Sequence, residues 1–228
     1  MDTQHTRAPN YKAPSLWETG SNWQWFVLIC LLYAYSTYMH QAFVISDALF
    51  YNSYGEQLAF ERIEQMLNVQ AKLSWVSYVF IPFFVGIKLL LVSLCLVGGS
   101  IWDSLKVGFR RIWSIVLRAE LIFALGSVCT VLFLTFFVEL STIEDLQGFH
   151  HFSLKGLFPF EDLNAWYLYP LQVVSLFEIL YVIFLVKGMQ ALSGKGAYVM
   201  LELVGKSYGL GLLIWVLMVI FLKLNLGL

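Results

Sequence analysis

The stretch FRRIWSIVLRAELIF, residues 109–123, decides the fold. It begins with two arginines and then becomes almost wholly apolar, and the apolar run continues to Val138. Such a run is long enough to cross a membrane, which takes roughly 20 mostly apolar residues. Yet Arg118 and Glu120 lie well inside it. A charged side chain in hydrocarbon costs about 2.5 to 3.5 kcal/mol or more, so these two residues are the first candidates for a function.

The composition of the whole chain is typical of a membrane protein. Of its 228 residues, 59% are hydrophobic and 13% are charged, and the mean hydropathy is +0.73. Soluble domains carry about 25% charged residues. The net charge of −1 does not by itself argue for or against a nucleic-acid partner; for a chain embedded in a bilayer we expect none. The three cysteines fall inside apolar runs without metal-ligand spacing, so we expect small buried thiols and no cofactor.

Five segments are apolar enough to span a membrane. They cover about residues 23–43, 73–97, 112–138, 166–192 and 208–224. We therefore predict an all-α fold, a polytopic membrane bundle of five transmembrane helices, with residues 1–22 as a cytoplasmic tail and residues 23–228 as a single domain. Some twenty polar residues precede the first span and no small-residue cleavage site follows it, so this span should be retained as a signal anchor.

The lysines and arginines predict the orientation, because cytoplasmic loops carry an excess of them. With the N-terminus inside, the cytoplasmic side receives nine: Arg7, Lys12, Lys106, Arg110, Arg111, Arg118, Lys187, Lys195 and Lys206. The opposite side receives four: Arg62, Lys72, Lys155 and Lys223. We predict an N-in, C-out protein of a bacterial inner membrane, with Lys106, Arg110, Arg111 and Arg118 in one cytoplasmic basic loop.

The outer loops should contain short interfacial helices. In residues 47–72, Leu58, Ile63 and Leu67 would share one face of an amphipathic helix on the outer membrane surface. In the second outer loop, Ser141 and Glu144 have the spacing of a capping box. The stretch GKSYGLG, residues 205–211, should form the turn into the fifth span.

Three ionisable residues on three different spans share one depth. Lys88, Glu120 and Glu178 each lie roughly 12 to 15 Å from the inner ends of their spans, at a rise of 1.5 Å per residue. Spans two and three are joined by a short loop, so Lys88 and Glu120 should pair, with Glu178 as a third member. Arg118 points away from Glu120, because two residues correspond to about 200° around a helix. Its long stem should return the guanidinium to the headgroups.

This cluster has two interpretations. It is either an interhelical clamp that fixes the register of the bundle, or a proton or ion relay or polar binding site between helices. A weaker candidate is an outer-face metal site of His40, His150 and His151 with Glu144 or Asp145. The sequence contains no phosphate loop, nucleophile motif or dinucleotide fingerprint, and we expect no enzyme.

Two stretches carry a resemblance. KLLLVSLCLVGGSIWDSLKVGFRRIWSIVLRAELIFAL, residues 88–125, resembles the Yip-domain membrane proteins, in which a helical hairpin turns around a short basic loop. EDLNAWYLYPLQVVSLFEILYVIFLVKGM, residues 161–189, is similar to five-span bacterial inner-membrane proteins near that group. The resemblance implies no enzymatic activity and transfers no binding residue. Eukaryotic Yip-domain proteins bind small GTPases in vesicle traffic and have a longer cytosolic N-terminal region, whereas only about twenty-two residues precede the first span here.

The leading expectation is a non-enzymatic membrane scaffold or accessory subunit of an envelope or secretion assembly. Its partners would be the lipid bilayer and other integral membrane proteins or further copies of the chain. The alternative is a small transporter or permease subunit, proton-coupled through Lys88, Glu120 and Glu178.

Overall fold

A computed structural model describes residues 21–55, 58–149, 152–157 and 165–226, and this part of the chain is helical apart from short turns and one isolated bridge between Ser153 and Ser175. Five helical runs within it are long and apolar enough to cross a membrane: Asn22–Val44, Phe60–Trp102, Phe109–Phe137, Leu176–Ser193 and Ala197–Asn225. The predicted all-α fold and the predicted number of spans are therefore confirmed, and the chain has the features of a multi-pass membrane protein.

The elements follow the chain in a simple order. They are α1 (Asn22–Met39), the π-helical turn η2 (His40–Val44), α2 (Asp47–Tyr54), α3 (Phe60–Trp102), α4 (Phe109–Phe137), α5 (Ile143–Gly148), the 3-10 turn η3 (Leu154–Leu157), α6 (Ala165–Val173), α7 (Leu176–Ser193), α8 (Ala197–Val204), the π-helical turn η4 (Gly205–Gly209) and α9 (Leu210–Leu226).

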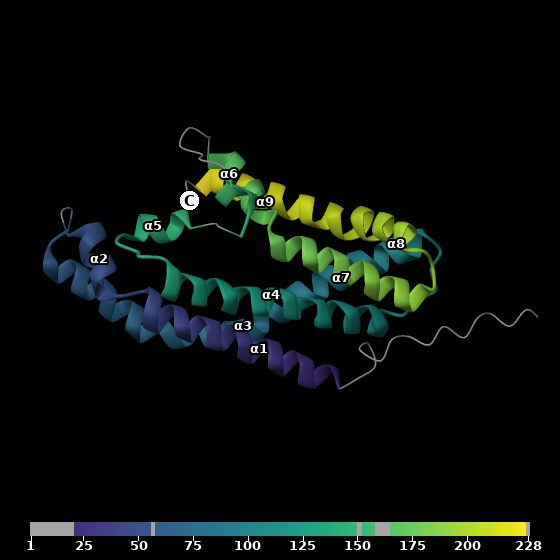
Figure 1. Cartoon of the computed structure of the whole chain (residues 1–228), viewed down its shortest axis with the longest axis horizontal. Helices are drawn as coiled ribbons and strands as arrows, with labels where there is room; N and C mark the ends of the chain where they lie inside the picture. Colours follow the sequence, from purple (N-terminus) through teal and green to yellow (C-terminus); the bar gives the residue numbers. More distant parts are fainter. Residues whose placement is uncertain (1–20, 56–57, 150–151, 158–164, 227–228) are drawn as a thin grey trace, which may run out of the picture.

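The long helices run roughly along the longest axis of the molecule (Figure 1). Helices α1, α3 and α4 pack against one another, α7 packs on α4, and α8 packs on α7 and α3. One end of the molecule carries α2 and α5, and we call it the α2/α5 end. The other, the α8 end, carries the α3–α4 turn (residues 103–108) and the α7–α8 turn (residues 194–196). Towards the α2/α5 end, α6 and α9 pack together and diverge from α4.

The main hydrophobic core lies in the half near the α8 end. Its fully buried members come from five helices: Ile29, Leu89, Leu96, Ile112, Leu117, Tyr181, Leu185, Met189, Met200 and Leu203. Close backbone approach strengthens this half. A Cβ atom on Gly99 of α3 would lie 2.5 Å from the Cβ of Ser207, and one on Gly211 would lie 2.8 Å from the Sγ of Cys95. Small residues at such contacts let membrane helices approach closely.

The second span differs from its prediction. Helix α3 has 43 residues, about 65 Å at 1.5 Å per residue, so residues 60–72 extend the same helix beyond the length needed to cross a membrane and do not form a separate surface helix. Among the described residues between η2 and α3, only α2, eight residues long, forms an independent helix. Of the three residues expected on the amphipathic face, Ile63 is buried and Leu58 is exposed before the helix begins. The sequence did not reveal this continuity because the charges between Glu61 and Lys72 looked like a loop boundary.

The fourth span is also wrong as predicted, because residues 166–192 form two helices and not one. Helix α6 ends at Val173 and α7 begins at Leu176. The backbone at the break is paired by another segment: Leu154 N–H donates to Val174 O, and Leu176 N–H donates to Phe152 O. Backbone that leaves a helix at membrane depth needs such partners, since hydrocarbon offers none.

The expected turn at GKSYGLG is wrong too. Residues 205–209 are the π-helical turn η4 inside one continuous helical run, Ala197–Asn225. The actual turn lies ten residues earlier, where Gly194 ends α7 with a φ of +67°. A positive φ favours glycine because it has no Cβ to collide with the backbone.

In the segment that follows α4, the capping box is formed by Thr142 and Asp145, one residue later than the predicted Ser141 and Glu144. It begins α5, a helix of six residues. The Thr142 hydroxyl and the backbone N–H groups of Thr142 and Ser141 hydrogen-bond with Asp145 and lower the pKa of its carboxyl group.

Candidate functional site

Lys88 and Glu120 form an ion pair between α3 and α4. The Lys88 Nζ lies 2.8 Å from the Glu120 Oε1. The two partners differ in exposure, because the side chain of Glu120 is 1% exposed and that of Lys88 is 40% exposed. The pair therefore joins a fully enclosed carboxylate to an ammonium group that is still accessible.

The carboxylate has a second partner on α1. The Tyr33 hydroxyl donates a hydrogen bond of 2.8 Å to the same Glu120 Oε1. Three helices thus meet at one oxygen atom. Helices α1, α3 and α4 also pack against one another, so this oxygen lies between three mutually packed helices.

Glu178 lies near the pair but makes a different contact. It occupies the first turn of α7, where the helix dipole favours negative charge, and it accepts a hydrogen bond of 2.6 Å from the Tyr208 hydroxyl of η4. Within the described residues no ion pair includes Glu178. It is linked to Lys88 through aromatic rings: Tyr181 and Tyr208 have ring centroids 5.5 Å apart, and the Lys88 Nζ lies 5.6 Å from the Tyr181 ring centroid.

Aromatic rings surround the lysine. The Lys88 Nζ lies 3.7 Å from the centroid of the Phe123 ring, which itself packs against Tyr181 with centroids 4.8 Å apart. A cation over a ring face is stabilised by the ring quadrupole, most strongly where water is excluded. The ammonium group is therefore held by one carboxylate and two rings, not by two carboxylates.

Lys88 and Glu120 lie closer to the middle of their helices than predicted, whereas Glu178 lies in the first turn of α7, at the end far from Ser193. Measured along the observed helices, Lys88 lies about 21 Å from the end of α3 at Trp102, Glu120 about 17 Å from the start of α4 at Phe109, and Glu178 about 22 Å from the end of α7 at Ser193. These distances exceed the expected ones because the observed helices extend further towards the α8 end. The three distances are similar, so the three residues still lie at about the same level.

Two buried polar atoms of this cluster have no hydrogen-bond partner in the described part of the chain. They are the Glu120 Oε2 and the Tyr181 hydroxyl oxygen, in residues that are 1% and 0% exposed. Native structures satisfy nearly all buried polar groups, and an exception at a defined place points to a role beyond packing. The cluster consequently has hydrogen-bonding capacity that its own residues do not use.

Arg118 does not behave as the sequence suggested. It was expected to reach back to the headgroups as part of the basic loop, but it is buried in α4, only 6% exposed. Its Nη1 donates to the Ser114 backbone oxygen at 2.9 Å, one turn earlier on the same helix. The other three residues of the predicted basic loop, Lys106, Arg110 and Arg111, are exposed at the α3–α4 turn and the start of α4.

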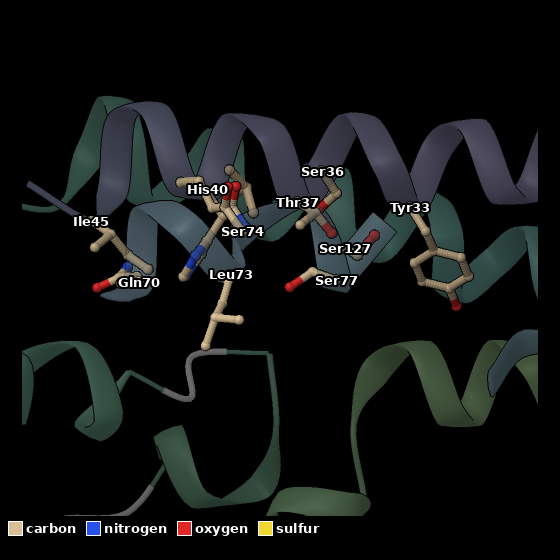
Figure 2. A pocket seen from close by; sticks show the side chains of 12 residues that line it. Tyr33, Ser36, Thr37, His40, Ile45, Gln70, Leu73, Ser74, Ser77 and Ser127 are labelled. Carbon is tan, nitrogen blue, oxygen red and sulfur yellow. The ribbon is translucent and has the colours of Figure 1, made fainter. Parts of the chain in front are cut away.

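A polar pocket lies beside this cluster, towards the α2/α5 end. Its volume is about 550 Å³, within the range of small-molecule sites. Helix α1 and η2 line it with Tyr33, Ser36, Thr37, His40 and Gln41; α3 lines it with Gln70, Leu73, Ser74 and Ser77; and α4 lines it with Ser127. Figure 2 shows the labelled side chains in a row, from Ile45 and Gln70 at one end to Tyr33 at the other.

Sequence reasoning missed this pocket, although the sequence carries its signal. In α1 the polar residues recur at intervals of three, four, seven and eight from Tyr33, which places them on one helical face. In α3, Gln70, Ser74, Ser77 and Lys88 share a face, since eighteen residues make five turns. A search for hydroxyl and amide stripes inside apolar spans would have found both, whereas a search for charges found only the lysine.

The predicted metal site receives no support from the arrangement of these residues. His40 lines the polar pocket, and His150 and His151 lie outside the described residues. Within the described residues, no group of three or more histidine, cysteine, aspartate or glutamate side chains could hold a metal ion. The three cysteines, Cys30, Cys95 and Cys129, are free thiols, but the expectation that they are buried is wrong, because the first two are partly exposed and Cys129 is exposed in this helix bundle.

The chain matches no protein-family model, no curated protein and no solved structure. A function for it therefore has to come from the chemistry of the site.

Proposed function

We propose that this chain is a small transporter or permease subunit, with Lys88, Glu120 and Glu178 as its intramembrane site. The observation that carries the proposal is the half-exposed Lys88 paired with a Glu120 carboxylate whose second oxygen is buried and unpaired. Ionisable residues in membrane spans are expensive, and they commonly mark ion or proton paths.

The purely structural interpretation fits this geometry less well. A clamp between helices is most stable when every lone pair and proton is satisfied, because a partly satisfied buried network costs more than an apolar contact. Here no described residue pairs with the second carboxylate oxygen of Glu120, and the ammonium group of Lys88 is accessible from outside the pair. Both features are what an exchangeable site requires.

Proton coupling follows from the same contacts. Lys88 has one carboxylate partner, so protonating Glu120 would remove the counter-charge of the lysine. The lysine would then be held by the Phe123 and Tyr181 rings alone, with Glu178 as the next carboxylate on α7. Protonation of Glu120 would thus favour movement of the Lys88 ammonium group away from Glu120 of α4 and towards Glu178 of α7. A transporter needs two such arrangements of similar free energy.

Two features of helix continuity support the same function. Tyr208, the partner of Glu178, sits in the π-helical turn η4, and His40 and Gln41 of the polar pocket sit in the π-helical turn η2. Such π-helical turns occur frequently at functional sites. Glu178 itself lies one turn after the break between α6 and α7, and interrupted helices often line the binding sites of transporters.

The scaffold function remains a second candidate, and one observation favours it. Gly205 and Gly209 are one turn apart on the continuous run Ala197–Asn225, and an added Cβ on either would meet nothing within 4 Å. This open small-residue face suits close packing of a helix from another protein or another copy. Association of copies would also enlarge a five-span unit, which is small for a transporter. For either function, we propose that the protein lies in a bacterial inner membrane with its N-terminus in the cytoplasm. The resemblance to Yip-domain proteins is likewise a proposal.

The test is proton flux into liposomes that contain the purified protein and a trapped pH-sensitive dye, with the membrane potential set by potassium and valinomycin. We expect flux above that of empty liposomes, lost in Glu120→Gln. The matched control is Glu202→Gln, because Glu202 forms an exposed ion pair with Lys206 at the α8 end. Equal flux in protein-containing and empty liposomes would overturn the transport function and leave the scaffold.

A further inference from the structure

The polar pocket and the ion pair meet at one residue. Tyr33 belongs to both, because it lines the pocket and donates to Glu120 at 2.8 Å. On α4, Ser127 of the pocket lies seven residues after Glu120 and hence on the same helical face. On α3, Lys88 continues the face of Ser74 and Ser77. The three packed helices therefore direct their polar faces towards a common axis.

Some side chains of the pocket are available to whatever enters it, although Ser74 and Ser127 donate hydrogen bonds to the backbone of their own helices. Thr37, His40, Gln70 and Ser77 make no side-chain hydrogen bond with other described residues, whereas Gln41 accepts one from Tyr78 at 3.3 Å. No lysine, arginine, aspartate or glutamate is among the lining residues. Hydroxyl, amide and imidazole groups without a fixed charge suit water, which both donates and accepts hydrogen bonds. Nothing in such a lining would hold an ion tightly.

The opposite end of the same three helices is closed. Below Glu120 the space between α1, α3 and α4 is filled by fully buried apolar residues, among them Ile29, Leu89 and Ile115. Near the start of α1, the Asn22 side-chain amide donates to the Ser114 hydroxyl of α4 at 2.8 Å. The pocket therefore lies on the α2/α5 side of Glu120, and buried apolar residues fill the α8 side.

We propose that this pocket is an aqueous access path that delivers protons from the α2/α5 side of the membrane to Glu120, with Tyr33 as the relay. Its use in transport rests on the function proposed above, but its accessibility to water does not. The titratable and charged groups that face Glu120 or its relay come from five elements. They are Cys30 and Tyr33 of α1, His40 of η2, Lys88 of α3, Glu178 and Tyr181 of α7, and Tyr208 of η4.

The transfer balances without any other reactant. A hydronium ion in the pocket gives a proton to the Tyr33 oxygen as the proton already on that oxygen passes to the Glu120 Oε1. One O–H bond forms on tyrosine, one breaks, and one forms on glutamate. Tyrosine is unchanged, the carboxylate becomes a carboxylic acid, and the hydronium ion becomes water. The 2.8 Å hydrogen bond from Tyr33 already points in the direction of this transfer.

Accessibility to water is tested by cysteine labelling, because methanethiosulfonate reagents need a hydrated, ionisable thiol. Cys30, Cys95 and Cys129 are first replaced by alanine, and a charged, membrane-impermeant methanethiosulfonate is added to one side of sealed vesicles at a time. The pocket variant is Ser77→Cys. Its matched control is Val79→Cys, two residues further on α3, exposed but outside the pocket. Glu64→Cys and Lys106→Cys report which side of the membrane is labelled.

We expect Ser77→Cys to be modified from the side that modifies Glu64→Cys, and Val79→Cys to remain unmodified. The access path is overturned if Ser77→Cys resists the reagent as Val79→Cys does, or if it reacts only from the side that modifies Lys106→Cys. Either result leaves the flux test of Glu120→Gln untouched, so the access path and the transport function fail separately.

The relay is tested with Tyr33→Phe, which removes the hydroxyl and keeps the ring. We expect proton flux to fall by about a hundredfold, the lower end of what a positioned proton-transfer group contributes, with labelling of Ser77→Cys unchanged. A merely structural role of Tyr33 would instead alter labelling and thermal stability together. Flux equal to that of the unsubstituted protein would overturn the relay.

Discussion

The two halves of the helix bundle on either side of Glu120 are built from the same helices but differ in what fills them. In the half near the α8 end, α1, α3, α4, α7 and α8 enclose apolar side chains that are almost completely buried. In the half near the α2/α5 end, the buried apolar cluster shrinks to Val44, Val131 and Leu134, and a polar pocket of about 550 Å³ lies beside it.

This difference indicates which half of the bundle can rearrange its side chains. A close-packed core resists rearrangement, because each side chain is held by many neighbours. A polar pocket in hydrocarbon is held by fewer contacts and exchanges its hydrogen bonds easily. The charged cluster lies at the boundary, where Glu120 is enclosed and Lys88 is half exposed. A site at such a boundary combines rigid support with access.

The largest effect on stability should come from Lys88→Leu, which removes the ion pair at the boundary between the two halves. It leaves Glu120 buried without its cation, and we expect a loss of about 3 kcal/mol in the free energy of unfolding. Thermal unfolding in detergent, followed by circular dichroism, measures it. The double variant Lys88→Leu with Glu120→Gln should recover part of the loss, since no uncompensated charge remains. Unfolding at the same temperature in Lys88→Leu and the unsubstituted protein would show that the ion pair contributes nothing to stability.

The next effect separates the two halves. Leu96→Ala opens a cavity in the tightly packed half, where Leu96 is 0% exposed, and we expect a loss of about 2 kcal/mol. This lies at the low end for leucine truncation, because membrane helices gain packing but little hydrophobic transfer from association. Ser77→Ala in the pocket should change stability by less than about 0.5 kcal/mol. Denaturant titrations measure both variants. If they lose the same free energy of unfolding, the proposed difference between the packed half and the pocket half is wrong.

A smaller effect tests the glycines of the same half. A Cβ on Gly99 would meet Ser207 at 2.5 Å, so Gly99→Ala should separate α3 from η4 and cost about 1 to 2 kcal/mol. Gly205→Ala has open space around it and should leave the free energy of unfolding unchanged or slightly higher.

Gly205→Leu adds a test of the scaffold function. If this face packs against another helix, the variant should lower the oligomer mass measured by light scattering while the protomer stays folded.

The smallest effect concerns the capping box of α5 at the α2/α5 end. The hydrogen bonds from Thr142 lower the pKa of Asp145 in the folded chain. A lowered pKa contributes stability above the pKa of the unfolded chain, near 3.9, and the contribution is lost as the pH falls through the folded value. Asp145→Asn should therefore weaken protection of the α5 amides from hydrogen exchange at pH 7 and have little effect below pH 3. Identical protection of the α5 amides in Asp145→Asn and in the unsubstituted protein at pH 7 would show that the capping box does not stabilise α5.

The sequence predicted the fold better than it predicted the site. Long apolar runs predict spans because hydrocarbon admits only helices here, whatever they pack against. The same reasoning failed at the break after Val173 and at the turn of Gly194, because α6, α7 and α8 are equally apolar on either side of these points. Depth along a helix correctly indicated that Lys88 and Glu120 share a level, but it gave no sign of Tyr33 or Tyr208, which carry no charge at neutral pH.

By itself the sequence determined that this chain is an all-helical membrane protein with five spans and three ionisable residues near one level. These properties depend on composition and on the rise of a helix, and both are local. Only the tertiary structure decided that Glu120 pairs with Lys88 and Tyr33, that Glu178 turns to Tyr208, and that Arg118 stays buried. The rotation of each helix about its axis selects these partners, and that rotation depends on how side chains from distant parts of the chain pack together.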